Sequence, residues 1–322
     1  MSTEAELAES VLADSLRADE TRLYAEYGFV PVERFVHVEV GSGGESQGVD
    51  VRVVSIPGDE AKTPVLLLHG IASVTAAAIP LIPSFGGAPV VAIDWPGHGL
   101  SGAFRFGARS DLRGFAVRVI DAVADATGLE RFDIVAHSLG GQFALYYCQA
   151  RPGRVRRLVL PGVPGAAFAQ LSPPLGMRLA AIPGLGRALI KPVSLEQYRT
   201  NSAMTLGAGA VDPWPPELVS VGWFASRRAA FAETLPGLFR SIASVFGVRA
   251  RAVIPADSLA AITTPTLFVW GDKDVFMTPA AGRPSWSRMP HAEIVEVTGG
   301  HAPWLNSPEE TGAAVREFLG RD

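Results

Sequence analysis

Two kinds of apolar segment follow one another along the chain. Residues 34–40 (RFVHVEV) and 50–56 (DVRVVSI) alternate apolar with polar side chains, which predicts an antiparallel hairpin with one face toward water. Later segments are apolar without interruption, as strands buried on both faces should be; these are residues 65–68, 90–93, 134–136, 158–160 and 266–270. Helical patterns lie between several of these runs, so we expect an α/β fold whose mostly parallel sheet is covered by helices on both sides.

Helical spacing is clearest after Ser110. Residues 112–123 repeat apolar side chains at this spacing, with Ser110 as the expected N-cap and Gly128 as the residue that closes the helix. The alternation of strands and helices stops between residues 166 and 262, where no buried-strand run occurs and Leu, Ala, Pro and Trp are frequent. We therefore expect a helical N-terminal segment (1–30), a sheet-forming core (31–165 and 263–322) and a helical lid inserted into that core (166–262).

Composition argues against several classes of function. Of the 322 residues, 48% are hydrophobic and 19% are charged, which is typical of a globular protein. The net charge is −4 and no Lys/Arg-rich run occurs, so nucleic acid is not an expected partner. The lone Cys148 cannot form an internal disulfide, no CxxC pair indicates a metal, and we expect neither a metal nor a cofactor. Because the N-terminus is acidic and no apolar run is long enough to span a membrane, the expected location is cytoplasmic.

One motif points to chemistry. Residues 132–150 (FDIVAHSLGGQFALYYCQA) run from a strand through a sharp turn into a helix, with Ser138 at the turn. This is the context of a nucleophile elbow, which exposes a serine hydroxyl at the end of a strand. The elbow pattern is G-x-S-x-G, and here Ala136 stands at the first glycine and Gly140 at the second. Both positions need small residues because the strained turn leaves little room, but the motif alone does not separate a nucleophile from a polar residue that closes a strand.

A serine nucleophile also needs a base and an acid at compatible places. Of the six histidines, His301 follows the strand EIVEV (293–297) on a loop at a carboxyl strand end, where sites of open α/β sheets gather. The acid is expected between the serine and the histidine, and FVWGDKDVF (268–276) offers Asp272 and Asp274 after another buried strand. Each aspartate alone could be a solvated loop residue.

Backbone donors for an oxyanion are expected at two places. One is the N–H of Leu139, directly after the serine at a helix N-terminus, and the other is the N–H of Ile71, after VLLLHG. His69, Asp94 and His98 lie in the neighbouring loops, and we expect them to brace the site by hydrogen bonds rather than to act on a substrate.

With these features in place, the chain resembles the α/β-hydrolase superfamily. The matching segments extend from Val65 to the C-terminus and read LLLHGI, AIDWPGHGLS, VAHSLGG, WGDKDVF and GGHAPW. The resemblance implies an eight-stranded sheet with an antiparallel second strand, a lid, and a triad of Ser138, Asp274 and His301. Within this family the second acidic position after a glycine such as Gly271 is usually the triad acid, which selects Asp274. Alanine at the first elbow position is a known variation.

The reaction expected from this site is hydrolysis of carboxylic esters or lactones through an acyl-enzyme. A serine at the elbow counts against haloalkane dehalogenases and epoxide hydrolases, which use an aspartate there. A carbon–carbon bond hydrolase and a cofactor-free perhydrolase remain alternatives, although the loop HGIASV lacks the further glycines usual in the former. A slow-turnover protein that binds or senses a ligand is the alternative from another class.

Aromatic side chains predict an apolar substrate pocket. Trp214, Trp223 and Phe224 lie in the expected lid, Trp304 lies close to His301, and His137 adjoins the nucleophile. For each aromatic, packing within the lid is the competing interpretation. As a group they favour an apolar, uncharged small molecule as substrate, and no Arg cluster indicates a phosphate or carboxylate ligand. The sequence carries no signal for the oligomeric state or for the role of residues 1–30.

Overall fold

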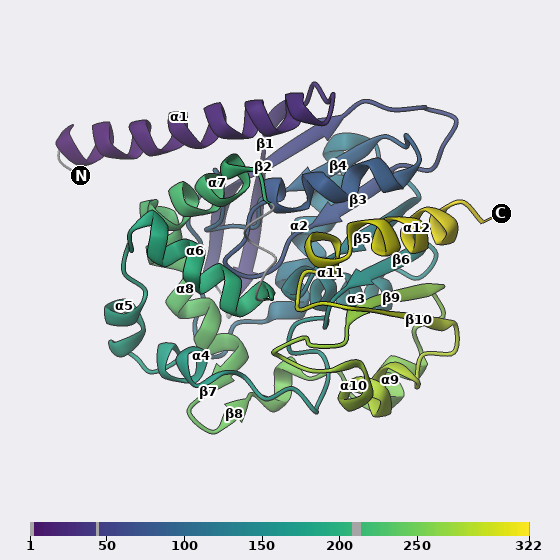
Figure 1. Cartoon of the computed structure of the whole chain (residues 1–322). Coiled ribbons are helices and arrows are strands. Elements are labelled where there is room, and N and C mark those ends of the chain that lie inside the picture. The colour runs from purple at the N-terminus through teal and green to yellow at the C-terminus, as the bar shows by residue number, and fades with distance from the viewer. Residues whose placement is uncertain (1–2, 43–44, 208–213, 322) are drawn as a thin grey trace.

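The computed structural model describes residues 3–42, 45–207 and 214–321 (Figure 1), so positions 208–213 of the expected lid lie outside the described residues. Within this part of the chain, eight strands form one sheet in the order β1-β2-β4-β3-β5-β6-β9-β10. Strand β2 (Glu45–Ile56) is antiparallel to both its neighbours, β1 (Val32–Ser42) and β4 (Val90–Ile93). The other strands are parallel: β3 (Val65–Leu68), β5 (Phe132–Ala136), β6 (Val155–Pro161), β9 (Thr266–Gly271) and β10 (Ala292–Val297). The expected sheet of eight mostly parallel strands is confirmed.

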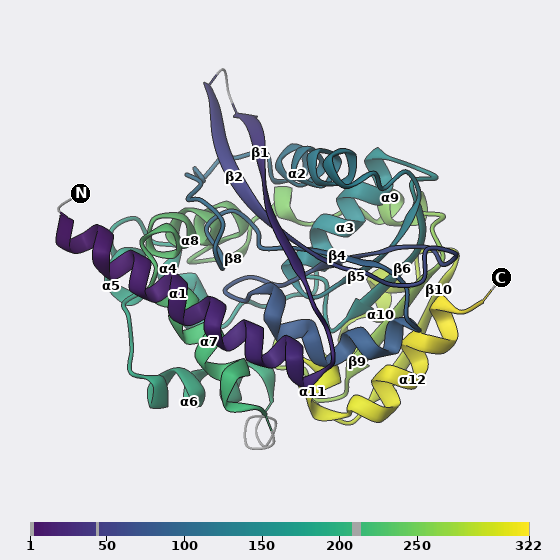
Figure 2. The ribbon, with the colours of Figure 1, turned by 90° about the horizontal axis from the view of Figure 1, so that it is seen from above.

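Helices cover both faces of the sheet (Figure 2). Helices α2 (Leu112–Thr127) and α3 (Leu139–Ala150) pack on one face over a first apolar core, and η1 (Thr75–Phe85) and α12 (Pro308–Leu319) pack on the other over a second core. Strand β3 shows why β3 and β4 have no polar position. Its residues alternate between the two cores, Leu66 and Leu68 into the first and Val65 and Leu67 into the second.

The start of α2 lies one residue from its predicted cap. Asp111 is the N-cap, and its carboxylate accepts a hydrogen bond from the Gly114 amide at 2.9 Å. The Ser110 hydroxyl instead accepts from the Gly107 amide in the preceding turn, so the prediction of Ser110 as the cap was wrong. Both residues carry a short oxygen-bearing side chain, and only the backbone path decides between them. Gly128 closes the helix in the left-handed region (φ 71°), as its sequence position predicts.

Strands β6 and β9 are separated by residues 162–265, which we call the insertion. Its described elements are mostly short helices: α4 (Leu175–Ala180), α5 (Leu185–Leu189), α6 (Leu195–Leu206), α7 (Pro216–Arg227), α8 (Ala229–Ile242), the hairpin β7 (Ala243–Ser244) and β8 (Gly247–Val248), η2 (Ala250–Ala252) and α9 (Ala256–Ala260). Helices α10 (Pro279–Trp286) and α11 (Pro303–Asn306) follow β9 and β10. No helix in the described ranges combines the length and the apolar character that crossing a membrane requires.

Helix α1 (Thr3–Glu26) lies along α7 of the insertion and reaches η1 (Figure 1). Near its start, Glu9 forms an ion pair of 2.7 Å with Arg228, at the beginning of α8. Farther along, the buried Glu20 binds the Arg52 guanidinium of β2 at 3.1 Å, and Arg52 also binds Asp94 at 3.0 Å. Burial alone would lower the pKa of Arg52, but the facing carboxylates hold it well above its ordinary value. The helix thus joins the insertion to the sheet through charged contacts.

Candidate active site

Ser138 occupies the turn between β5 and α3 in a strained conformation. Its φ of 52° and ψ of −119° are unusual for a residue with a side chain. Crowding around the turn explains why the flanking positions 136 and 140 carry small residues. Ala136 is fully buried at the end of β5, and a Cβ added to Gly140 would lie 2.6 Å from the carbonyl oxygen of His69 and 2.7 Å from that of Leu68. These are backbone atoms of β3 and the loop after it, so a larger residue at position 140 would push the elbow out of place.

His301 and Asp274 meet on the loops after β10 and β9. The Nδ1 of His301 donates to Oδ2 of Asp274 at 2.9 Å, and both side chains are buried. The same carboxylate accepts from the amides of Val163 (3.2 Å) and Phe276 (3.0 Å). Burial on its own would raise the pKa of Asp274, but the facing His301 and these hydrogen bonds outweigh it, so the pKa lies below its ordinary value. Asp274 is therefore held as a carboxylate that fixes the orientation of the imidazole.

The second candidate acid has a different position. The Oδ1 of Asp272 accepts a hydrogen bond of 2.9 Å from the amide of Gly299, in the loop that carries His301. Asp272 thus ties the loops after β9 and β10 together, while Asp274 faces the histidine.

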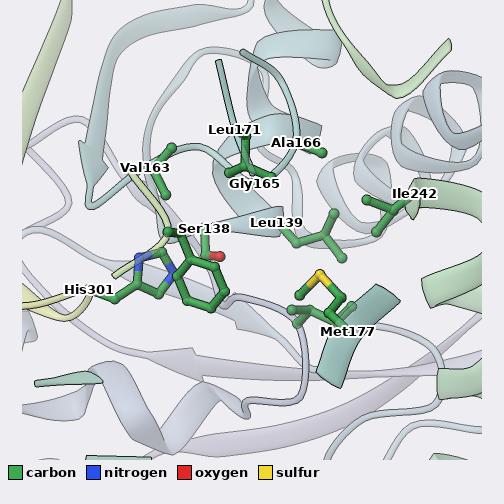
Figure 3. A pocket seen from close by; sticks show the side chains of 11 residues that line it. Ser138, Leu139, Val163, Gly165, Ala166, Leu171, Met177, Ile242 and His301 are labelled. Carbon is green, nitrogen blue, oxygen red and sulfur yellow. The ribbon is translucent and has the colours of Figure 1, made fainter. Parts of the chain in front are cut away.

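Ser138 and His301 line the same cavity (Figure 3), in which water-sized molecules have about 40 Å³ of accessible space. The other lining residues are mostly apolar: Ile71, Leu139, Val163, Gly165, Ala166, Leu171, Met177, Ile242 and Phe276. Among the residues that the structure describes, no Asp, Glu, Lys or Arg belongs to this lining. A charged part of a ligand would therefore lose its hydration here without gaining a partner of opposite charge.

Two backbone N–H groups beside the serine are free to bind an anion. Neither the amide of Leu139 nor that of Ile71 donates a hydrogen bond to another described residue, and both residues line the cavity. Leu139 is the first residue of α3, where the helix dipole favours negative charge. Ala72 follows Ile71 with a positive φ of 54°, and its own N–H donates to Nε2 of His98 at 3.1 Å, which fixes this loop. Donors placed in this way could stabilise a negative charge that develops beside Ser138.

Two buried histidines brace this loop. His69 donates from Nδ1 to the carbonyl of Gly70 (2.7 Å), and its Nε2 accepts from the amide of Trp95 (3.0 Å). His98 donates from Nδ1 to the carbonyl of Pro96 at 3.1 Å. Burial lowers the pKa of His69 and lowers that of His98 to about 3, so both rings stay neutral and can donate and accept at once. Their partners are the bracing contacts expected from the sequence.

His137 directly precedes Ser138 but is not among the residues that line the cavity. Its Nε2 donates to the backbone carbonyl of His301 at 2.9 Å, and its ring packs edge-on against Trp304 with centroids 4.8 Å apart. Trp304 in turn donates from its indole nitrogen to the carbonyl of Ala77 (2.9 Å). Burial lowers the pKa of His137 well below its ordinary value. His137 therefore connects the elbow to the loop of His301 as a neutral donor.

The three aromatic residues expected from the lid also lie away from this cavity. Trp223 donates from its indole nitrogen to the carbonyl of Val193 (2.8 Å), while Trp214 and Phe224 pack against the second core. None of the five pocket candidates, His137, Trp214, Trp223, Phe224 and Trp304, is among the lining residues, so the structure does not support that part of the sequence analysis. Large aromatic rings pack where they bury most area and where an indole N–H finds an acceptor.

Apart from Ile71, Ser138, Leu139 and His301, the residues that form the cavity wall were missed by the sequence analysis. Val163 lies two residues after the end of β6 and Phe276 five residues after the end of β9, and their positions after buried strands could have indicated a place at the site. Leu171, Met177 and Ile242 come from the insertion, and no local pattern distinguishes them from residues that pack inside it.

The fold and the site together define a hydrolase of the α/β class. The family described as the alpha/beta hydrolase fold matches residues 63–308, and the chain belongs to this family. It is 28% identical over 239 residues to a 2-hydroxy-6-oxononadienedioate/2-hydroxy-6-oxononatrienedioate hydrolase of Cupriavidus pinatubonensis, covering 72% of this chain and 76% of that protein. It is 30% identical over 248 residues to a pimeloyl-[acyl-carrier protein] methyl ester esterase of Neisseria meningitidis, covering 72% and 82%.

A similar solved structure is that of a carboxylesterase from Bacillus subtilis. The two share 17% sequence identity with a TM-score of 0.72, over 96% of this chain and 98% of the esterase. At this identity the likeness concerns the fold alone.

Proposed function

We propose that the protein hydrolyses carboxylic esters or lactones of apolar, uncharged small molecules through an acyl-enzyme. The observation that carries the proposal is the cavity beside Ser138: its side-chain lining is apolar apart from Ser138 and His301, and two unpartnered amides adjoin the serine. Such a cavity favours a neutral acyl group and offers donors only where an oxyanion forms.

In the proposed reaction, the hydroxyl oxygen of Ser138 attacks the ester carbonyl. The Nε2 of His301 takes the hydroxyl proton, since its Nδ1 is engaged by Asp274. The amides of Ile71 and Leu139 stabilise the negative charge on the former carbonyl oxygen. The C–O bond to the alcohol then breaks, His301 returns the proton to the alcohol oxygen, and the acyl group stays on Ser138. Water, deprotonated by His301, attacks this ester in turn and releases the acid.

The same cavity bears on the competing reaction, hydrolysis of a carbon–carbon bond. The name of the similar hydrolase of Cupriavidus pinatubonensis denotes a dicarboxylate substrate. A dicarboxylate calls for cationic partners, and no Lys or Arg is among the described residues that line this cavity. We therefore favour the ester. We further assign residues 166–262 a lid function, because Leu171, Met177 and Ile242 from this segment form part of the cavity wall.

The test combines a fluorophosphonate probe with p-nitrophenyl esters of increasing acyl length. Wild type and Ser287→Ala should be labelled and should turn over neutral esters, because Ser287 is exposed on a different surface. Ser138→Ala should lose both activities and keep its circular dichroism spectrum. Labelling without turnover of any ester would refute ester hydrolysis but keep the nucleophile. Absence of both in the folded wild type would refute the assignment of Ser138.

A further inference from the structure

Exposed apolar side chains gather on one part of the insertion. Phe246, in the two-residue turn of the β7–β8 hairpin, is 93% exposed, and Leu175 at the start of α4 is 67% exposed. Helix α4 packs against both α5 and β7, and Figures 1 and 2 show these elements next to one another. We call the outer side of α4, α5, the hairpin and η2 the apolar–basic face; its other exposed apolar residues are Leu185, Leu189 and Val245. Exposed large apolar residues gathered in this way indicate an interaction surface.

The charge of this face has one sign. The sequence contains no Asp or Glu in residues 163–195 or 234–256, the segments that form the face. The same segments carry six basic residues, Arg178, Arg187, Lys191, Arg240, Arg249 and Arg251. This contrasts with the net charge of −4 for the whole chain.

The described arginines of the face keep their charge available. Arg178 donates to the backbone carbonyl of Val245, and Arg249 donates to that of Arg240, so neither is neutralised by these contacts. Arg251 is exposed, and partial burial together with the nearby Arg249 and Arg109 lowers its pKa from the ordinary value, as expected where like charges gather. The ion pairs of the described residues include none of Arg178, Arg240, Arg249 or Arg251.

The face is also the outer side of the cavity wall. Met177, which lines the cavity, lies two positions after Leu175 on α4. Ile242, another lining residue, ends α8 just before the hairpin that carries Phe246. The elements that close the cavity are thus the ones that present apolar and basic side chains to the outside.

We propose that the apolar–basic face docks onto an anionic lipid surface, with Phe246 inserted among the acyl chains and the arginines against the headgroups. Basic side chains around an apolar insertion match the two attractions that hold peripheral proteins on such membranes. Lipid is favoured over an acidic protein because Phe246 protrudes from a hairpin tip, and a bilayer accepts a protruding ring without a pocket shaped for it. The proposal concerns binding and does not depend on the reaction at Ser138.

Co-sedimentation with vesicles tests this directly. The full chain should bind vesicles that contain phosphatidylglycerol, bind pure phosphatidylcholine far more weakly, and be released by high salt. Phe246→Ser should weaken binding roughly tenfold or more, since an inserted aromatic side chain is lost. Arg251→Glu should also weaken it roughly tenfold or more, through the charge reversal. Leu7→Ser is the matched control, because Leu7 is 66% exposed on α1, outside this face, and it should bind as wild type does.

Circular dichroism and thermal unfolding establish that each variant is folded, and Arg251→Glu provides a second test should Phe246→Ser misfold. The proposal is overturned if wild type ignores phosphatidylglycerol vesicles, or if Leu7→Ser loses as much binding as Phe246→Ser. Equal binding to neutral and anionic vesicles would overturn the role of the arginines. Binding to an acidic carrier protein with no binding to vesicles would replace the lipid by a protein partner.

Discussion

The buried His98 predicts a measurable acid sensitivity. Its ring is 1% exposed and lies between the amide of Ala72 and the carbonyl of Pro96, with the rings of His69 and Phe231 beside it. The neutral imidazole satisfies both backbone groups, since Nδ1 donates and Nε2 accepts. Protonation would put a second N–H opposite the Ala72 amide and a charge in an apolar site, which is why the folded state resists it.

The size of the effect follows from the two pKa values. Burial lowers the pKa of His98 from 6.5 to about 3 in the folded protein, so only the unfolded chain binds a proton between these values. The contribution of His98 to stability is therefore complete above the unfolded pKa and declines as the pH falls toward the folded one. The slope is about 1.4 kcal/mol in the free energy of unfolding per pH unit below 6.5. Between about pH 7.5 and about pH 5.5, His98 alone removes about 1.4 kcal/mol.

Urea denaturation of wild type and His98→Gln across this pH range measures the slope. Glutamine can donate to the Pro96 carbonyl and accept from the Ala72 amide but does not titrate, so any fixed cost of the substitution cancels when slopes are compared. The variant should lose about 1.4 kcal/mol less than wild type over the two pH units. His37→Gln is the control. Hydrogen bonds to Asp50 and Glu39 raise the pKa of this exposed histidine, so the folded state binds its proton more tightly than the unfolded chain does. Removing His37 should therefore not reduce the loss of stability toward low pH. Equal slopes for wild type and His98→Gln would refute the reasoning.

Three further substitutions test other parts of the structure. Gly140→Ala should abolish ester turnover and lower the free energy of unfolding in urea by about 1–3 kcal/mol, because the new Cβ meets backbone oxygens. Gly176→Ala is the control, since a Cβ there meets nothing within 4 Å, and it should match wild type. Similar behaviour of the two variants would contradict this account. Arg52→Met should cost about 3–5 kcal/mol in chemical unfolding, since buried carboxylates lose their cation, and a loss below about 1 kcal/mol would count against that account. His137→Phe keeps the packing but leaves the His301 carbonyl without its donor, so kcat should fall roughly tenfold at a similar KM in steady-state kinetics, and an unchanged kcat would show that the contact is dispensable.

The central apolar strands of the sheet could be predicted because their side chains are buried on both faces. Strand β3 reads VLLL since all four side chains enter a core, and the same holds for β4, so local pattern and final burial agree. The elbow could be predicted for a similar reason, because strand, turn and helix lie within one short segment. The N-cap of α2 could not, since Ser110 and Asp111 have equal capping ability and differ only in backbone path.

The pairing of side chains across the site was harder to predict. Asp272 and Asp274 follow the same strand, and only the path of the loop turns one toward Gly299 and the other toward His301. The cavity wall was harder still, because Met177 and Ile242 reach it from helices far apart in sequence. Size was a poor guide to the pocket residues: the indole N–H groups of Trp223 and Trp304 donate to backbone oxygens elsewhere, and aliphatic side chains such as Met177 and Ile242 line the cavity.

The contacts of Arg52 constrain how the sequences of related proteins can differ from this one. Its guanidinium binds the buried carboxylates of Glu20 on α1 and Asp94 after β4, and the partly exposed carboxylate of Glu33 on β1. The family match begins at residue 63, after both α1 and β2. A descendant that loses the helix would keep a buried cation with one acid fewer, and a descendant that loses the arginine would keep two buried acids facing each other. We therefore expect related sequences to retain or lose α1 and Arg52 together.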